Sequence, residues 1–287
     1  MNPALLIAGH GTRDPKGAAA FAALTARMAR RHAADMPVAG GFIELSEPPL
    51  KDAVTELAAR GQRDLVAVPL MLSAAGHSKG DIPAALARET GRHPGLSIRY
   101  GRPLGPHPVL LNLMAARIAA VAGPEPPAVL LVGRGTSDPD GNADVVKVAR
   151  LLWEGRDYEF TETAFISLTR PSVPEGLERC RRLGARHIVV ARYFLFPGVL
   201  PDRVAEQAAT FAAGHRDLDV RTTDVLGDCD EIAGLVEERY HEALAGDIRM
   251  NCDTCLYRVA LPGFADRVGA AQHPHDHPDD HDHVHPA

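Results

Sequence analysis

The chain repeats itself. The segment "LIAGHGTRDPKG", which starts at Leu6, matches "LLVGRGTSDPDG", which starts 124 residues later at Leu130. "GGFIELSEPPL" matches "TAFISLTRPSV", and "RDLVAVPLMLSAAGHSKGDIPAAL" matches "RHIVVARYFLFPGVLPDRVAEQ". Three matched blocks in the same order and at a nearly constant offset indicate an internal duplication. Because only two copies occur, the pattern predicts a paired domain and excludes a solenoid.

Each copy alternates apolar runs with amphipathic stretches. "ALLIAG" and "LVAVPLML" in the first copy correspond to "AVLLVG" and "HIVVARYFLF" in the second, and helical patterns such as "KGAAAFAALTARMARRHA" lie between such runs. Strands that alternate with helices predict βαβ units and parallel sheets covered by helices on both faces. We therefore expect an α/β protein with two similar lobes, each a parallel sheet of about four strands flanked by helices.

The boundaries of the lobes follow from composition. "VAGPEPPAV" has three prolines in nine residues and is typical of a linker. The periodicity ends near residue 246. We expect an N-terminal lobe over residues 1–122, a C-terminal lobe over 126–245, and an extension over 246–287.

Charge and hydropathy exclude several classes of protein. No apolar run reaches the ~18–20 residues that a membrane span needs, and the N-terminus lacks the basic region of a signal peptide. The net charge of −6 argues against nucleic-acid binding, and the four aspartates after His273 leave −2 for the rest. Four cysteines do not make a disulfide framework in so long a chain. We expect a cytoplasmic protein, and a homo-oligomer stays open.

Three potential metal ligands follow successive strands of the first copy. His10 lies just past the first predicted strand, Glu44 at the end of the second, and His77 after the third. The carboxyl ends of parallel strands share one edge of a sheet, and neighbouring strands lie about 4.8 Å apart. Two imidazoles and a carboxylate suit a divalent iron, cobalt, nickel or zinc ion. The sequence thus predicts a metal site at this edge.

The second copy serves as an internal control. Its residues at the three ligand positions are Arg134, Ser167 and Val199, whereas the surrounding glycines and prolines are kept. Each ligand taken alone has an ordinary alternative role, as a turn, capping or solvated residue. Their joint placement and joint replacement favour a metal-handling site in the first lobe only.

Several cationic side chains lie near the same edges. We expect substrate contacts from Arg13, Lys79, Arg134, Arg170 and Arg203. Guanidinium groups bind carboxylates in bidentate fashion, so a cleft between such edges would suit a ligand with several carboxylates. The alternative is that these residues are ordinary surface charges.

The motifs "GHGTRDP", "FIELSEPPL" and "LMLSAAGHSKGDIP" resemble those of the class II chelatases that act on sirohydrochlorin. The resemblance covers residues 3 to 260 and is strongest to the long-form sirohydrochlorin cobaltochelatases of cobalamin biosynthesis. It implies two α/β lobes around a central cleft and ATP-independent insertion of Co²⁺ into sirohydrochlorin. On this resemblance His10 and His77 bind the metal and accept pyrrole protons, and Glu44 acts as a metal ligand or proton relay.

Two alternatives to cobalt insertion stay open. Imidazole and carboxylate ligands do not separate Co²⁺ from Fe²⁺ or Ni²⁺, so a sirohydrochlorin ferrochelatase of sirohaem biosynthesis is the first. A non-catalytic metal-storage or metallochaperone protein is the second.

The extension holds two further motifs. Cys252 and Cys255 lie in "MNCDTCLYR", and long members of the family have a similar segment associated with an iron–sulfur cluster. A [4Fe–4S] cluster normally takes four thiolates, so a free dithiol or a zinc site is the alternative. The acidic tail carries six histidines: His273, His275, His277, His281, His283 and His285. We expect a disordered metal reservoir or delivery arm, with an inert tail as the alternative.

Overall fold

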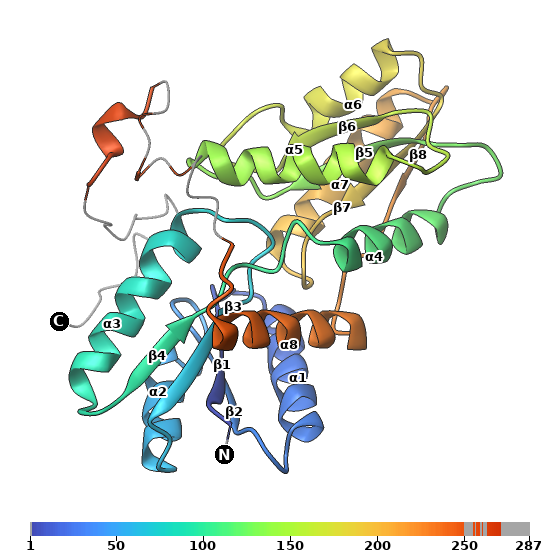
Figure 1. The fold of residues 1–287 in the computed structure, drawn as a ribbon. Coiled ribbons are helices and arrows are strands. Elements are labelled where there is room, and N and C mark those ends of the chain that lie inside the picture. Colours follow the sequence, from blue (N-terminus) through green and yellow to red (C-terminus); the bar gives the residue numbers. More distant parts are fainter. Residues whose placement is uncertain (1, 250–254, 256, 259, 261–262, 271–287) are drawn as a thin grey trace.

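A computed structural model describes residues 2–249, 255, 257–258, 260 and 263–270. Within this part of the chain two parallel sheets form the centres of two lobes (Figure 1). The first sheet has the order β2-β1-β3-β4 and consists of β1 (Ala4–Gly9), β2 (Val38–Phe42), β3 (Asp64–Pro69) and β4 (Ser97–Tyr100). The second has the order β6-β5-β7-β8 and consists of β5 (Ala128–Gly133), β6 (Thr161–Phe165), β7 (His187–Arg192) and β8 (Asp219–Thr222). The predicted α/β class with two similar four-stranded lobes is confirmed.

Helices connect the strands in each lobe. In the first repeat they are α1 (Pro15–Arg31), α2 (Leu50–Ala59), the π-helical turn η1 (His77–Asp81), α3 (Ile82–Arg92) and α4 (Pro108–Ala119). In the second repeat they are α5 (Pro139–Trp153), α6 (Val173–Arg182), α7 (Val199–Gly214) and α8 (Asp230–Ala245), and a short 3₁₀ turn, η3 (Ala265–Arg267), lies in the extension. The element order of the first repeat therefore recurs in the second, apart from the turn η1.

Alternation along the central strands explains why helices cover both sheet faces. In β1, Leu5 and Ile7 belong to a core cluster with residues of α1, whereas Leu6 belongs to a separate cluster with residues of α2 such as Leu57. All six residues of β1, and all six of β5, are buried. Such fully buried strands read as unbroken apolar runs, which is the pattern that predicted them.

The last helix of each repeat packs against the other lobe. α4 follows β4 in the chain but contacts α5 and β7, and α8 follows β8 but contacts β3, β4 and α1 (Figure 1). One core cluster consequently runs through both lobes, from Leu24 of α1 to Val148 of α5. The predicted boundaries at residues 122 and 126 separate the sequence repeats, whereas each folded lobe is completed by a helix from the other repeat.

A buried arginine fastens α8 to the first lobe. The side chain of Arg239 is fully buried; its Nε donates to the carbonyl of Pro103 at 3.0 Å and its Nη2 to that of Leu104 at 2.9 Å. Its Nη1 pairs with Glu242 at 3.0 Å, and Arg102 also pairs with Glu242, at 2.7 Å. Burial lowers the pKa of Arg239. Since a buried charge is tolerated only with such partners, this network fixes the position of α8.

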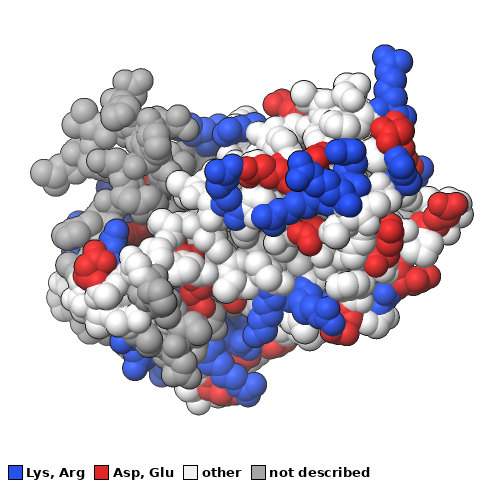
Figure 2. Space-filling view, turned by 90° about the horizontal axis from the view of Figure 1, so that it is seen from above, with Lys and Arg blue, Asp and Glu red and all other residues white. Residues whose placement is uncertain are grey.

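The outer surface carries mixed charge. In Figure 2, basic and acidic side chains interleave over the face seen from above. Many charges of the described residues are paired on the surface, as Arg181 is with Glu178 at 2.7 Å. None of the helices in the described residues is long and apolar enough to cross a membrane.

Candidate metal site in the interlobe cavity

The same strand-end turn is built twice. Gly11 has φ +109° and Gly135 has φ +86°, and an added Cβ would lie 1.8 Å from the carbonyl oxygen of Glu44 or 2.0 Å from that of Ser167. Only glycine fits so close a backbone approach at positive φ. The backbone N–H of Glu44 donates to the carbonyl of His10 at 3.1 Å, as that of Ser167 does to Arg134 at 3.0 Å. The turn is thus a scaffold. It fixes the position of the side chain at residues 10 and 134, whichever residue type stands there.

His77 is placed by the π-helical turn that precedes α3. The N–H of Ile82 donates to the carbonyl of His77, five residues back. Tyr100 at the end of β4 donates its hydroxyl to the carbonyl of Ser78 at 2.7 Å, which holds the turn against the sheet. π-turns inside helices often occur at functional sites. Here the turn brings the imidazole of His77 to the carboxyl end of β3.

The three predicted ligands converge. His10 Nε2 lies 2.8 Å from His77 Nε2 and 3.0 Å from Glu44 Oε1. One ligand atom of each residue lies within 4.8 Å of the others. In the sheet order β2-β1-β3 the strand that precedes His10 is flanked by the strands that precede Glu44 and His77. This is the topological switch point, where open parallel sheets bind ligands.

Hydrogen bonds on the far side of each ring favour one tautomer of the neutral imidazole. His77 Nδ1 lies 2.7 Å from Asp81 Oδ2, and His10 Nδ1 lies 3.1 Å from the carbonyl of Gly11. Both acceptors require a proton on Nδ1, so both neutral rings carry a lone pair on Nε2. Two imidazole lone pairs and a carboxylate oxygen then face each other at 2.8–3.0 Å. Such an arrangement is stabilised by a cation or a shared proton between them.

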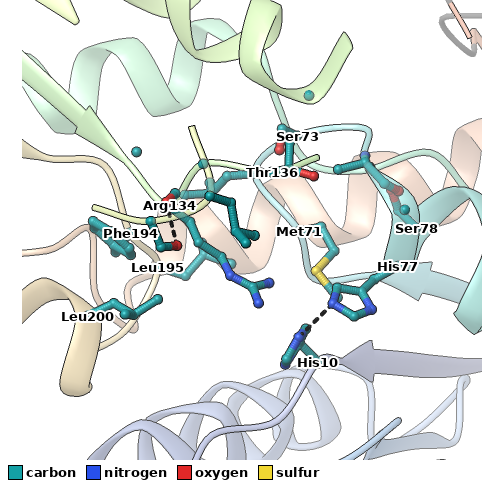
Figure 3. A pocket seen from close by; sticks show the side chains of 18 of the residues that line it. His10, Met71, Ser73, His77, Ser78, Arg134, Thr136, Phe194, Leu195 and Leu200 are labelled. Carbon is teal, nitrogen blue, oxygen red and sulfur yellow. Dashed lines mark hydrogen bonds between the residues drawn. The ribbon is translucent and has the colours of Figure 1, made fainter. Parts of the chain in front are cut away.

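The second lobe contributes a cation where the first has His10. Figure 3 shows the guanidinium of Arg134 directed toward the rings of His10 and His77. Burial lowers the pKa of Arg134, and the negative charge of Glu44 acts in the opposite direction. The two strand ends therefore face each other with different chemistry, a metal-ligand set on one side and a fixed positive charge on the other.

A cavity of about 750 Å³ lies between the lobes, and His10 and His77 are part of its wall. Its walls include the loops after β1, β2 and β3 in the first lobe and after β5, β6 and β7 in the second. Much of the wall is apolar, and the apolar lining includes Leu45, Met71, Leu72, Leu168, Phe194, Leu195, Phe196, Val199 and Leu200. Leu168 and Val199 are more than half exposed and extend the apolar lining to the mouth of the cavity. The volume suits a large organic ligand.

The five predicted substrate-binding cations divide into two groups. Arg13, Arg134 and Arg203 line the cavity. Lys79 is not part of the wall, since its ammonium pairs with Asp138 at 2.8 Å and Asp140 at 2.7 Å. This nearly buried pair joins η1 of one lobe to the start of α5 in the other.

Arg170 is also not part of the wall. Its side chain is 83% exposed and pairs with Glu175 of its own lobe. Lys79 and Arg170 both lie beside strand ends in the sequence. The acidic residues that pair with them determine the orientation of their side chains.

The cysteine and histidine motifs lie mostly beyond the described residues. Cys252 and the six tail histidines, His273 to His285, fall outside them, whereas Cys255 is described and half-buried. Cys180 lies in the core of the second lobe, where burial raises the pKa of its thiol to about 12. A thiol so protected is not a ligand for a metal at Cys255.

Asp81 is the site residue that sequence reasoning missed. It stands four residues after His77, the spacing that places two helical side chains on one face, so the sequence did carry a signal for it. Tyr257, Phe264 and Arg267 of the extension also line the cavity. Nothing in their spacing predicted this.

Comparisons with known proteins agree with this architecture. The sirohydrochlorin cobaltochelatase of Priestia megaterium is 37% identical over 90% of this chain and 85% of its own length. The sirohydrochlorin ferrochelatase of the same organism is 30% identical over 71% of this chain and 77% of its own length. The structure of SirB from Bacillus subtilis with Fe³⁺ superposes with a TM-score of 0.73 at 28% identity, covering 86% of this chain and 97% of that one.

The repeats themselves match a family model. The CbiX model fits twice, to residues 4–121 and again to residues 128–243. The two matches take in both strand-end turns, the three converging side chains, helix α4 and α8 up to residue 243. By this match the chain belongs to the CbiX family.

Proposed function

We propose that this protein is a sirohydrochlorin cobaltochelatase, which inserts Co²⁺ into the macrocycle without ATP. The observation that carries the proposal is the convergence of two imidazole lone pairs and the Glu44 carboxylate beside an apolar, arginine-bearing cavity. In this reaction the metal ion is a substrate. A site with few protein ligands, two of them on the cavity wall, suits an ion that must be handed on.

Each ligand has a stated task in the proposed reaction. His10 and His77 hold the incoming ion through Nε2 while Asp81 and the Gly11 carbonyl keep Nδ1 protonated. Once the ion has passed to the four pyrrole nitrogens, the same Nε2 lone pairs are free to accept the two protons that those nitrogens release. Glu44, 3.0 Å from His10 Nε2, stabilises the imidazolium that forms there and relays the proton onward.

The opposite wall is suited to orienting the macrocycle. Apolar side chains of the second lobe present a surface for its flat face, and Arg13, Arg134 and Arg203 present guanidiniums for its carboxylates. Arg134 has a second effect, because a fixed positive charge facing the ligand set weakens binding of a divalent cation. Weak binding of the metal ion to the protein favours its transfer to the macrocycle.

The choice of cobalt rests on similarity. The cobaltochelatase relative matches more of this chain, and at higher identity, than the ferrochelatase relative does. The ligand set itself does not distinguish Co²⁺ from Fe²⁺ or Ni²⁺. A [4Fe–4S] cluster at Cys252 and Cys255, a metal reservoir in the histidine tail, a homo-oligomer and a cytoplasmic location stay predictions, and no step above depends on them.

Metallation of sirohydrochlorin tests the proposal. The purified full chain is mixed with sirohydrochlorin and with Co²⁺, Fe²⁺ or Ni²⁺ in turn, and the change in absorption is followed against a protein-free control. We expect acceleration that is greatest with Co²⁺. His10→Ala and His77→Ala should abolish it, whereas His93→Ala, a matched change at a surface pair with Thr55, should not.

Each other outcome has a defined meaning. Greatest acceleration with Fe²⁺ would replace cobalt insertion by iron insertion at the same site. A wild-type rate equal to that of the protein-free control for every metal would favour metal storage or delivery and reject the chelatase.

A further inference from the structure

The extension after α8 contributes to the cavity. The chain leaves the end of α8, which packs on the first lobe, and η3 lies on the side of the molecule where α5 of the second lobe begins (Figure 1). Tyr257, Phe264 and Arg267 from this segment line the same cavity as His10 and His77. The repeats supply the other walls in pairs, but the extension follows the second repeat only.

Burial within the segment separates inward from outward residues. Tyr257 and Phe264 are half-buried, whereas Arg258, Ala260, Gly263 and residues 265–269 are exposed. Cys255 and Ala270 are also half-buried, but of the half-buried residues only the two aromatic ones line the cavity among the described residues. An aromatic ring that is partly exposed toward a cavity can stack on a flat conjugated ligand.

Backbone hydrogen bonds join parts of the segment that carries the two aromatic residues. The N–H of Gly269 donates to the carbonyl of Tyr257 at 3.1 Å, which closes a loop that contains Phe264 and Arg267. Within the loop, Arg267 N–H donates to the carbonyl of Phe264 at 3.0 Å. The three cavity-lining residues thus lie in one segment whose ends are joined by a backbone hydrogen bond.

The charge of Arg267 is available to a ligand. Its guanidinium lies 4.0 Å from Asp266, and both side chains are more than half exposed. Exposed ion pairs at such a distance contribute little free energy. Arg267 can therefore leave Asp266 and pair with a carboxylate of the ligand at little cost in free energy. Arg267 joins Arg13, Arg134 and Arg203 as the cavity-lining arginines of the described residues.

We propose that Tyr257, Phe264 and Arg267 form a substrate-binding wall, in which the two rings stack on the macrocycle and Arg267 pairs with one of its carboxylates. This inference rests on the proposed function for the identity of the ligand. It assigns the extension a role in holding the tetrapyrrole that is separate from any role of its cysteines. It predicts a loss of macrocycle affinity without a loss of metal affinity when the wall is altered.

Binding of metal-free sirohydrochlorin to the full chain, followed by its fluorescence, tests the wall independently of catalysis. Phe264→Ala should raise Kd about 3- to 10-fold, the range expected for one lost aromatic contact. Arg267→Gln should raise Kd similarly at low salt, with a smaller difference at high salt because screening weakens the ion pair. Val268→Ala and Arg258→Gln, exposed neighbours that do not line the cavity, should stay within twofold of wild type, and Co²⁺ affinity should be unchanged throughout.

The outcomes distinguish the wall from the proposed function. Wild-type Kd values for both Phe264→Ala and Arg267→Gln overturn the wall, whatever the metallation rate. If the wild type binds the macrocycle but does not accelerate metallation, the chelatase proposal fails. The Kd values of the variants still show whether the three residues form a substrate-binding wall. A wild type that does not bind sirohydrochlorin rejects both.

Discussion

Gly11 and Gly135 occupy the same turn in the two lobes, and their replacement by alanine separates scaffold from chemistry. Each has a positive φ, and each added Cβ meets a carbonyl oxygen, at 1.8 Å from that of Glu44 or at 2.0 Å from that of Ser167. Since real Cβ contacts stay above 3.0 Å, each carbonyl must retreat by about 1 Å. Strain of this kind should cost about 2–4 kcal/mol in either variant.

The two substitutions should therefore have similar effects on stability and different effects on the metal site. At roughly 2–4 °C per kcal/mol, each variant should lower Tm by about 5–15 °C. In Gly11→Ala the displaced residue is Glu44, whose carboxylate must lie 3.0 Å from His10 Nε2, so Co²⁺ affinity should fall about 10- to 100-fold. In Gly135→Ala the displaced residue is Ser167, and Co²⁺ affinity should stay near that of wild type.

Calorimetric titration with Co²⁺ alongside thermal unfolding measures both quantities. The predicted histidine tail is common to all variants, and a His10→Ala/His77→Ala double variant gives the contribution of sites other than the triad. The reasoning is refuted if Gly11→Ala loses stability but keeps wild-type Co²⁺ affinity, or if both variants lose Co²⁺ affinity equally.

Three further predictions follow from the contacts around the site and α8. Asp81→Asn removes the charge behind His77 Nδ1 and should weaken Co²⁺ binding about 10-fold with Tm nearly unchanged, as titration and thermal unfolding will show. Arg239→Met leaves two buried carbonyls without donors and should destabilise the fold by about 3–5 kcal/mol in denaturant titrations. Hydrogen bonds from Arg102 hold the pKa of Glu242 below its usual 4.5. The contribution of Glu242 to stability should be fully present above that pH and lost as pH falls through the lowered folded pKa, so Glu242→Gln should flatten the acid limb of the stability profile.

Each of these three has a contrary result. Unchanged Co²⁺ affinity in Asp81→Asn would mean that the carboxylate does not orient His77. A loss of less than about 1 kcal/mol in Arg239→Met would mean that the exchanged helix α8 is held by apolar packing alone. An acid limb that is the same with and without Glu242 would exclude its ion pair as a source of acid sensitivity.

The sheets, and the convergence of His10, Glu44 and His77, could be predicted from the sequence because both depend on local order. Fully buried strands such as β1 read as apolar runs, and the residue after such a strand must lie at the sheet edge. The internal duplication supplied the contrast between His10 and Arg134, and the structure places these two residues at equivalent turns that face each other.

What the sequence could not predict depends on partners from the other repeat. Lys79 was expected to contact substrate, but Asp138 and Asp140 of the second lobe pair with it. The exchange of α4 and α8 likewise results from packing between lobes, which a repeat pattern does not encode. Phe264 lines the cavity through a turn with no periodic signal.

The shared scaffold with divergent turn residues gives the protein one edge with a candidate metal-ligand set and one cationic edge. If the His10 and His77 rings bind a single cation, then cobalt in a crystal of the full chain should give an anomalous peak between their Nε2 atoms, at about 2.1 Å from each, with Glu44 as the third protein ligand. A saturating cobalt soak in which the anomalous peaks lie elsewhere, with both rings free of metal, would contradict the site on which the proposed function rests.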